Sequence, residues 1–452
     1  MAQAAARHSN LDLDRALAEA ERDFIDANPA SMAAFTHACA GMPGGTTRNV
    51  LYYPPFPLNI VQGAGARIRD ADGHGYTDWM GDMSAGLFGH SNPEIMAAAT
   101  EALQAGLTLG GPNRYEAALA EAVCSRFPAI DLVRFTNSGS EGSYMAIATA
   151  RAVTGRPRVM VMESGYHGGH FTFGRPTADS DGSSSLNVPY DFVFGQLNDW
   201  PATEAVLRQV GAELAAIVVE PVMGAGGCIP AEPAFLQELR DWCSANGSLL
   251  VFDEVMTSRL APGGMQGKLG IHPDLTVLGK WIGGGFSFGG FGGRAAIMER
   301  FDPRRADALS ASGTFNNNVM TMAAGLAGLT RVFTPDRAVD VNERGDRLRQ
   351  ALNGVAEATG VPFHFTGAGS LIGIHAVAAP VHRPRDTYGR SEPALSLFHL
   401  ALLEAGHYIA RRGYMALNIE LTDDDCDALT AAAEGIFARF GPALRQAVLG
   451  RG

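Results

Sequence analysis

Runs of apolar residues alternate with amphipathic segments through the middle of the chain. Short runs rich in Val, Ile, Leu and Phe predict β-strands at 132–137, 157–162, 215–221 and 248–254. Apolar positions at helical spacing predict helices at 93–106, 115–127, 141–154 and 232–246. Strands that are apolar on both faces and are separated by helices are typical of a mainly parallel sheet covered on both sides. We therefore predict an α/β fold for this region.

The two ends of the chain have a different pattern. At the N-terminal end the sequence predicts a helix at 11–40 and short strands within 60–79. At the C-terminal end it predicts helices at 337–358 and 424–440, with strands within 362–376 and 407–418. We expect three parts: an N-terminal segment of a small domain, a large domain and a C-terminal small-domain segment, which span 1–85, 86–334 and 335–452.

Composition narrows the classes of function. A chain of 452 residues with 46% apolar and 18% charged residues fits a globular protein with a large buried interior. The net charge of -12 and the lack of a Lys/Arg run argue against nucleic acid or an anionic membrane as a partner. No apolar stretch is long enough to span a membrane, and the N-terminus lacks the apolar core of a signal peptide.

Cysteine and lysine usage adds two constraints. The five cysteines are scattered, without a CxxC pair or a metal-like spacing. We therefore expect reduced thiols, a cytoplasmic location and no metal site. Lys268 and Lys280 are the two lysines of the chain. Chemistry that needs a primary amine on a side chain has these two candidates.

The segment NSGSEG, residues 137–142, lies between a predicted strand and a predicted helix. Gly139 allows close backbone approach, Ser138 and Ser140 carry hydroxyls, and a helix N-terminus offers free N–H groups, so the segment suits a phosphate. A plain helix cap formed by Ser138 or Ser140 would explain the same residues. The segment lacks the spacing of a P-loop and of G-x-G-x-x-G, so it does not support a nicotinamide cofactor.

An aspartate and a lysine each follow an apolar run. Asp253 ends a buried strand, where a carboxylate needs a cationic or hydrogen-bonding partner. That partner is either a structural ion pair, for example with Arg259, or a protonated ligand nitrogen such as the pyridinium of pyridoxal phosphate. Lys280 follows TVLG and precedes three glycines, and burial would lower the pKa of its amine and make it nucleophilic. Lys268 lies in a polar, glycine-rich segment typical of a surface.

The segment GYHG, residues 165–168, follows the predicted strand at 157–162. Tyr166 could stack on a flat cofactor ring or pack in the core. His167 by itself is more often a hydrogen-bonded structural residue than a general base.

Taken together, these segments resemble the fold-type I pyridoxal-phosphate enzymes, specifically the class III aminotransferases. The resemblance runs from about residue 40 to the end and rests on NSGSEG, GYHG, VVEPV, DEVMTSR, LGKWIGGG and SGTFNNN, which occur in the family's order. The chain is most similar to two branches, the glutamate-1-semialdehyde aminomutases and the aromatic β-amino acid aminotransferases. The resemblance implies a large domain with a mainly parallel seven-stranded sheet, and a smaller α+β domain built from both ends of the chain.

The resemblance also implies the residues that act on the cofactor. Lys280 would carry pyridoxal 5'-phosphate as a Schiff base and later move the proton. Asp253 would pair with the pyridinium nitrogen. Val255 would pack on one face of the ring and Tyr166 would stack on the other, while Glu220 would lie near the cofactor.

The phosphate contacts implied by the resemblance come from two subunits. Ser138, Gly139 and Ser140 would hold the phosphate, and Thr314 in SGTFNNN would reach the phosphate of the neighbouring subunit, which predicts a homodimer. Ser140 and Gly142 stand where the family usually has Thr and Ala. Both changes keep the hydroxyl and the small size.

Two arginines are candidates for binding a substrate carboxylate, because a planar guanidinium suits a carboxylate. Arg48 lies in GGTTRNVLYYPPFP, a loop that resembles that of the β-amino acid aminotransferases, and its neighbours Tyr52, Tyr53 and Phe56 could wall an apolar pocket. Arg412 is the second candidate, for the α-carboxylate of the acceptor. For either arginine, a surface ion pair is the other interpretation.

We therefore predict pyridoxal-phosphate-dependent transamination of a β-amino acid of the β-phenylalanine type, with a keto acid acceptor such as 2-oxoglutarate or pyruvate. The alternative is glutamate-1-semialdehyde 2,1-aminomutase, but residues 410–414 carry arginine and lack that enzyme's glutamate. A non-catalytic pyridoxal-phosphate regulator is disfavoured because both Lys280 and Asp253 are present. A nicotinamide-dependent oxidoreductase would need a dinucleotide-binding loop.

Overall fold

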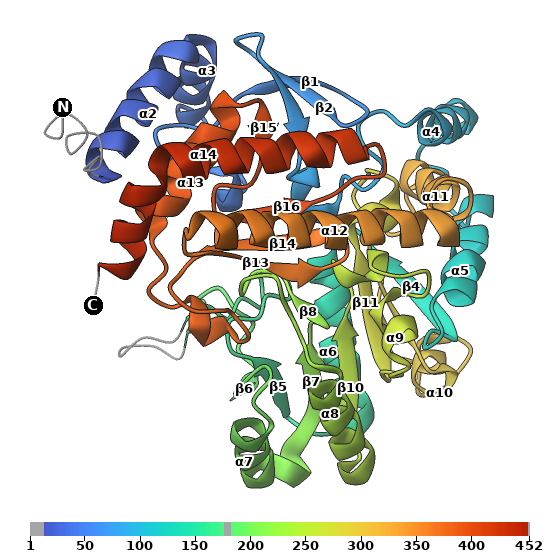
Figure 1. The fold of residues 1–452 in the computed structure, drawn as a ribbon. Helices are drawn as coiled ribbons and strands as arrows, with labels where there is room; N and C mark the ends of the chain where they lie inside the picture. The colour runs from blue at the N-terminus through green and yellow to red at the C-terminus, as the bar shows by residue number, and fades with distance from the viewer. Residues whose placement is uncertain (1–12, 176–181, 451–452) are drawn as a thin grey trace, which may run out of the picture.

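The apolar runs predicted as strands lie side by side in a seven-stranded sheet of the computed structural model, which describes residues 13–175 and 182–450 (Figure 1). The strands, in spatial order, are β4 (Leu132–Thr136), β12 (Gly289–Gly293), β11 (Leu275–Gly279), β10 (Leu249–Asp253), β7 (Leu214–Val219), β5 (Arg158–Met162) and β6 (Asp191–Gly195). β12 runs antiparallel to both of its neighbours, and the other adjacent pairs are parallel. The predicted mainly parallel sheet is confirmed.

Alternate residues of the central strands face opposite layers of helices, as the period of a strand requires. In β10, Leu249 and Val251 pack in the cluster that contains α6 (Gly139–Thr154). Leu250 and Phe252 pack in the cluster that contains α7 (Trp200–Val210) and α8 (Pro233–Asn246). The sheet is therefore buried on both faces. Further helices of this region are α4 (Pro93–Ala105), α5 (Arg114–Arg126), α9 (Gly264–Leu269), α10 (Ala295–Met298) and α11 (Val319–Ala327).

The hydrophobic pattern does not predict β6 or β12, and it marks β11 only as an apolar run. The sequence of β12 is GGFGG, and glycine disfavours strands because it lacks a side chain to pack. Nevertheless every residue of β12 is buried. A Cβ at Gly289 would collide with the backbone of Ser138, so the missing side chain allows the NSGSEG segment to lie against this strand.

The two ends of the chain meet in one smaller sheet, and the C-terminal part forms another by itself. One has the order β1 (Ile60–Ala64), β2 (Arg67–Asp70), β3 (Gly75–Asp78) and β15 (His407–Tyr408), and in it β15 lies parallel to β3. The other is formed by β13 (Phe363–Ala368), β14 (Leu371–Ala376) and β16 (Tyr414–Ala416). Around them lie α2 (Leu13–Ala27), α3 (Pro29–Cys39), α12 (Pro335–Thr359), α13 (Glu392–Glu404) and α14 (Asp423–Leu449) (Figure 1).

The prediction of one continuous helix over 11–40 is wrong, because the segment forms two helices. Residues 11 and 12 lie outside the described residues. Asn28 is non-helical, with φ -126° and ψ 50°, and it separates α2 from α3. The physical reason is Pro29, because a proline disfavours the helical conformation of the residue before it. The helix predicted at 424–440 continues to Leu449 and contains Pro442.

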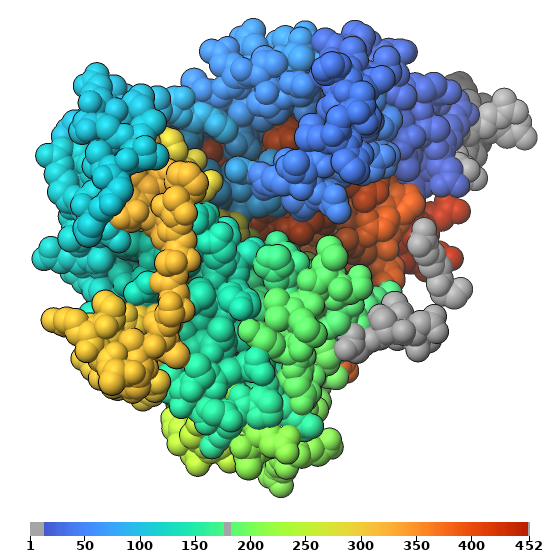
Figure 2. All heavy atoms as spheres, turned by 180° about the vertical axis from the view of Figure 1, so that it is seen from behind, coloured from blue at the N-terminus to red at the C-terminus, as the bar shows by residue number. Residues whose placement is uncertain are grey.

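Within the described ranges, no helix is both long enough and apolar enough to cross a membrane. Seen from behind, the blue N-terminal segment lies above the teal and green segments, and the surface between them is hollowed (Figure 2).

Candidate active site

The segments predicted to carry chemistry converge at one edge of the large sheet. β4, β5, β7, β10 and β11 are mutually parallel, so their carboxyl ends lie at the same edge. A cavity of about 530 Å³ opens there. Its lining consists of Arg48, Asp82, Ala85, Asn137, Ser138, Gly139, Ser140, Ser143, Tyr166, His167, Gly168, Glu220, Asp253, Val255, Met256, Lys280, Gly285, Phe286, Ser287 and Phe288.

Lys280 is the first residue after β11. Burial lowers the pKa of its amine to about 8, although the negative charges of Asp253 and Glu220 oppose the shift. The residue is half-buried, and its amine forms no ion pair with any described residue; such an amine is reactive because much of it is neutral near pH 8. The backbone of Lys280 is left-handed, with φ 54°, which is strained for a residue with a side chain. Such strain is found at functional sites.

Asp253, the last residue of β10, is buried and hydrogen-bonded on both oxygens. Oδ1 accepts the Val255 N–H at 3.0 Å, and Oδ2 lies 2.8 Å from Nδ1 of His167. Burial alone would lower the pKa of His167, but the hydrogen bond and the charge of Asp253 raise it above its usual value. The alternative prediction of an ion pair between Asp253 and Arg259 is wrong, because the Arg259 guanidinium binds Ser370 and two backbone carbonyls.

The NSGSEG segment forms the first turn of α6. The Ser138 hydroxyl accepts the Glu141 N–H, and the first intrahelical bond runs from the Gly142 N–H to the Ser138 carbonyl. The Gly139 and Ser140 N–H groups precede that bond and have no hydrogen-bond partner among the described residues, so they can bind a ligand. Ser138 thus caps the helix, as one interpretation predicted, and the turn also lines the cavity.

Small residues bring three loops together around this turn. A Cβ at Gly168 would collide with Ser140, whose hydroxyl accepts the Gly169 N–H at 3.2 Å. Val255 lies directly over Gly139, where a Cβ would approach it to 2.9 Å. The loops after β4, β5 and β10 therefore form one compact wall.

Glu220 has a contact that the sequence did not define. Its buried carboxylate accepts the Tyr166 N–H at 3.0 Å and the Gly224 N–H at 2.9 Å, so it fixes the loop that presents Tyr166 to the cavity. The tyrosine side chain itself is 44% exposed. Burial raises the pKa of Tyr166, and the charges of Arg412 and Arg48 oppose the shift.

The two candidate arginines differ in position. Arg48 lines the cavity, and its Nη1 donates to Oδ1 of Asp82 at 2.6 Å. Arg412 lies outside the lining, with Nη2 3.8 Å from the sulfur of Met83 and the guanidinium over the ring of Tyr414. Burial lowers the pKa of Arg412.

The expected apolar pocket beside Arg48 is absent from the cavity wall. Tyr53 and Phe56 are each 4% exposed and pack in a core cluster with Phe24, whereas Tyr52 is exposed. Apolar wall is supplied instead by Phe286 and Phe288. No hydrophobic period marks this glycine-rich segment, so its sequence does not indicate that either phenylalanine lines a site. Thr314 is exposed and lies outside the lining of this chain's own cavity.

Comparison with known proteins identifies the family. A family model for class III aminotransferases matches residues 51–434. A β-phenylalanine transaminase of Variovorax paradoxus is 48% identical over 436 residues, which are 96% of this chain and 99% of that protein. A glutamate-1-semialdehyde 2,1-aminomutase of Sorangium cellulosum is 36% identical, over 91% of this chain and 97% of that protein.

Solved structures agree with the sequence matches. The structure of a β-phenylalanine aminotransferase from Variovorax paradoxus has a TM-score of 0.92 and 49% identity, and the match covers 95% of this chain and 98% of that chain. The chain therefore belongs to the class III aminotransferases. It is a pyridoxal-phosphate-dependent enzyme of fold type I.

The cavity fits the chemistry of pyridoxal 5'-phosphate. This cofactor presents a carbonyl that an amine can attack, a ring nitrogen that a carboxylate can pair with, and a phosphate. The amine of Lys280, the buried carboxylate of Asp253 and the free N–H groups of the α6 N-terminus all line the same cavity. Among the described residues, no group of His, Cys, Asp and Glu side chains could hold a metal ion.

Proposed function

We propose that the protein transfers the amino group of a β-amino acid of the β-phenylalanine type to a keto acid such as 2-oxoglutarate or pyruvate. The observation that carries this proposal is the guanidinium of Arg48 on the wall of the cavity that holds Lys280 and Asp253. It can bind a substrate carboxylate while the substrate amine lies at the cofactor. The high identity to a β-phenylalanine transaminase over nearly the whole chain supports the same substrate class.

In this proposal each polar group has a defined partner on the cofactor. Lys280 would hold the cofactor covalently, and Asp253 would pair with the ring nitrogen. Val255 and Tyr166, which both line the cavity, would pack on opposite faces of the ring. The phosphate-binding residues are Ser138, Gly139 and Ser140. Glu220 keeps Tyr166 in place through the backbone hydrogen bond described above.

When bound, pyridoxal phosphate supplies an electron-poor ring that accepts the electron pair of the broken C–H bond. Nζ of Lys280 would remove the proton from the amine-bearing carbon and deliver it to the cofactor carbon, and its lowered pKa of about 8 suits an amine that both accepts and donates a proton. Asp253 would hold a proton on the facing ring nitrogen, and the 2.8 Å contact with Nδ1 of His167 orients its carboxylate.

The remaining predictions concern the assembly and the second substrate. We propose that Arg412, whose charge acts on both Lys280 and Tyr166, binds the α-carboxylate of the acceptor. We further propose a homodimer in which Thr314, exposed here, binds the phosphate of the neighbouring subunit.

We also propose that the large domain is residues 86–334 and that the small domain combines 1–85 with 335–452. The five free cysteines are consistent with the cytoplasm.

A half-reaction tests the proposed activity. The holoenzyme is mixed with racemic β-phenylalanine in the absence of keto acid, and the visible spectrum is followed. Conversion of the bound cofactor to its amine form is the expected result, because the first half of transamination needs no acceptor. If the spectrum does not change but glutamate-1-semialdehyde alone is isomerised, the protein is instead an aminomutase and the proposal is wrong.

Replacing Arg48 with alanine should raise KM for β-phenylalanine about 30- to 100-fold, the loss expected for a two-pronged, charge-assisted hydrogen bond. The cofactor should bind as before, because Arg48 is assigned to the substrate. Steady-state kinetics and a cofactor titration measure the two effects. 1-Phenylethylamine, which lacks the carboxylate, is the control donor, and its KM should not rise. Unchanged kinetics with β-phenylalanine would move the carboxylate site elsewhere.

Replacing Gly168 with alanine should weaken cofactor binding about tenfold or more, because a left-handed alanine is strained and its Cβ collides with Ser140. The measurement is a titration of the apoenzyme with pyridoxal phosphate. Gly169→Ala is the matched control, because a Cβ at Gly169 has no neighbour within 4 Å and this glycine does not have a positive φ. Equal affinities for the two variants would contradict the role of Ser140.

A further inference from the structure

Asp82, the partner of Arg48, lies in an unusual backbone segment. Gly81, Asp82, Met83 and Ser84 all have positive φ, with values of 51°, 42°, 55° and 76°. Three of these residues carry side chains, for which the left-handed conformation is unfavourable. A turn of this kind persists only where the surrounding structure imposes it, and such imposed strain is found mainly at functional sites.

The surrounding structure holds this turn from several sides. Oδ1 of Asp78 accepts the N–H groups of Met80 and Gly81 at 2.9 and 3.0 Å. The backbone of Gly81 lies so close to the carbonyl of Ala416 that a Cβ would come within 2.6 Å of that oxygen. The carbonyl of Ser84 accepts a hydrogen bond from the buried Arg259. The carboxylate of Asp82 is therefore presented from a rigid support.

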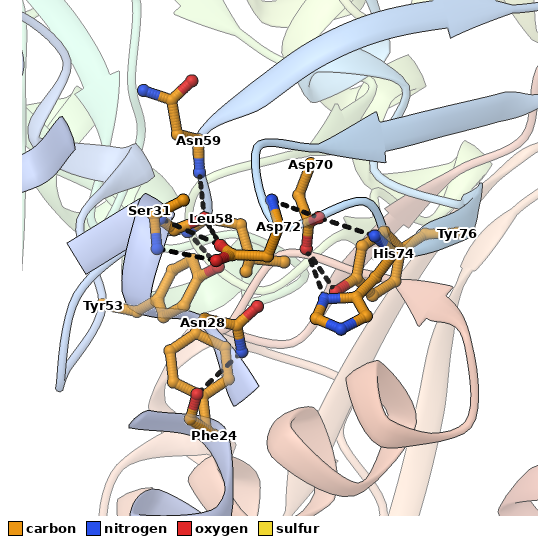
Figure 3. A network of polar contacts seen from close by, with 11 residues as sticks. Phe24, Asn28, Ser31, Tyr53, Leu58, Asn59, Asp70, Asp72, His74 and Tyr76 are labelled. Atoms are coloured by element: carbon orange, nitrogen blue, oxygen red, sulfur yellow. Dashed lines mark hydrogen bonds and ion pairs between the residues drawn. The ribbon is translucent and has the colours of Figure 1, made fainter. Parts of the chain in front are cut away.

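The segment between Ser31 and Leu58 contains Arg48. Hydrogen bonds hold this segment at its two ends, and none ties the backbone of Arg48 to a distant part of the described chain. Before Arg48, Asp72 in the β2–β3 turn accepts the N–H of Ser31 at the start of α3, and after it the Tyr53 hydroxyl accepts the Leu58 N–H (Figure 3). The backbone of Arg48 bonds only to the near neighbours Thr46 and Leu51 within the described chain.

The Arg48 side chain is 43% exposed, and its hydrogen bond and ion pair within the described chain are with Asp82. That contact uses a single nitrogen, Nη1. A guanidinium has five N–H donors, so the edge formed by Nε and Nη2 is left to bind a carboxylate with two parallel hydrogen bonds. Both side chains line the cavity with Lys280.

We propose that Asp82 is a positioning residue that holds the Arg48 guanidinium on the cavity wall and presents its remaining edge to the carboxylate of the amino donor. This inference rests on the proposed function, in which Arg48 binds that carboxylate. Asp82 acts through Arg48 and does not contact the reacting atoms. Its removal therefore affects binding of the donor rather than the chemical step.

The test is a double-mutant cycle with Asp82→Asn and Arg48→Ala, measured as kcat and KM for β-phenylalanine. Asparagine is close in shape to aspartate and tolerates a left-handed backbone, so the turn is preserved. We expect Asp82→Asn to raise KM about fivefold with kcat unchanged, the size expected for a partly exposed ion pair. In the Arg48→Ala background the same change should have no further effect, because the pair is already lost.

Asp191→Asn is the matched control, since Asp191 forms an exposed ion pair with Arg158 at 2.8 Å in β5 and β6, away from the cavity. Its KM should equal that of the parent enzyme. If Asp82→Asn raises KM equally with and without Arg48, or lowers KM, then Asp82 acts independently or competes with the substrate, and the inference is wrong while the proposed function stands. If Arg48→Ala leaves KM unchanged, the carboxylate site in the proposed function is itself wrong.

Discussion

Replacing Lys280 with alanine is expected to lower kcat about 10⁴-fold or more, because one amine both holds the cofactor and moves the proton. Burial prepares this amine for both tasks, since it lowers the pKa of Lys280 to about 8. The variant should also lose the visible absorbance of the covalently held cofactor. Turnover with β-phenylalanine and the absorption spectrum of the purified protein measure the two losses.

The chain offers a nearly ideal control for this experiment, because Lys268 is its other lysine. Lys268 is exposed in α9, and it lies outside the lining of the cavity. Lys268→Ala should keep full activity and colour. Reduction of the parent enzyme with borohydride, followed by peptide mass mapping, should place the cofactor on the peptide that contains Lys280. A fully active Lys280→Ala variant, or label on Lys268, would refute the assignment.

Replacing Asp253 with asparagine is expected to lower kcat about 10²- to 10³-fold, the range found when one preorganised electrostatic contact is removed. Asparagine has a similar shape but no charge, so it cannot keep a proton on the facing ring nitrogen. It also weakens the 2.8 Å contact with His167, whose pKa the aspartate raises. The pH profile of kcat should change as well, because the charge of the buried pair has changed.

Two further variants separate the charge of Asp253 from its structural contribution. Asp253→Glu keeps the charge and should recover part of the activity. Asp274 is a buried carboxylate at the opposite end of the sheet, where it binds Arg240 and the Leu250 N–H. Asp274→Asn should lower the melting temperature but leave kcat unchanged. If Asp253→Asn lost no more activity than Asp274→Asn, Asp253 would have only a structural role.

The hydrophobic pattern of the sequence predicted the strands whose residues are most deeply buried. β7 and β10 are apolar on both faces because helices cover both sides of the sheet, so their runs of Val, Ile and Leu are visible without a structure. β12 was not visible, since its glycines are present for close backbone packing and carry no hydrophobic signal. The break between α2 and α3 had a local signal in Pro29, which the helical spacing around it concealed.

By itself the sequence determined which chemical groups are available: one lysine in an apolar context, an aspartate at a strand end and a glycine- and serine-rich helix start. Each of these is local, because strand ends and helix starts are defined by neighbouring residues. Only the tertiary structure decided that His167 binds Asp253, that Glu220 fixes Tyr166 and that Asp82 holds Arg48. These contacts join residues that are 86, 54 and 34 positions apart. No hydrophobic period encodes them, because they depend on where separate strands and turns end in space.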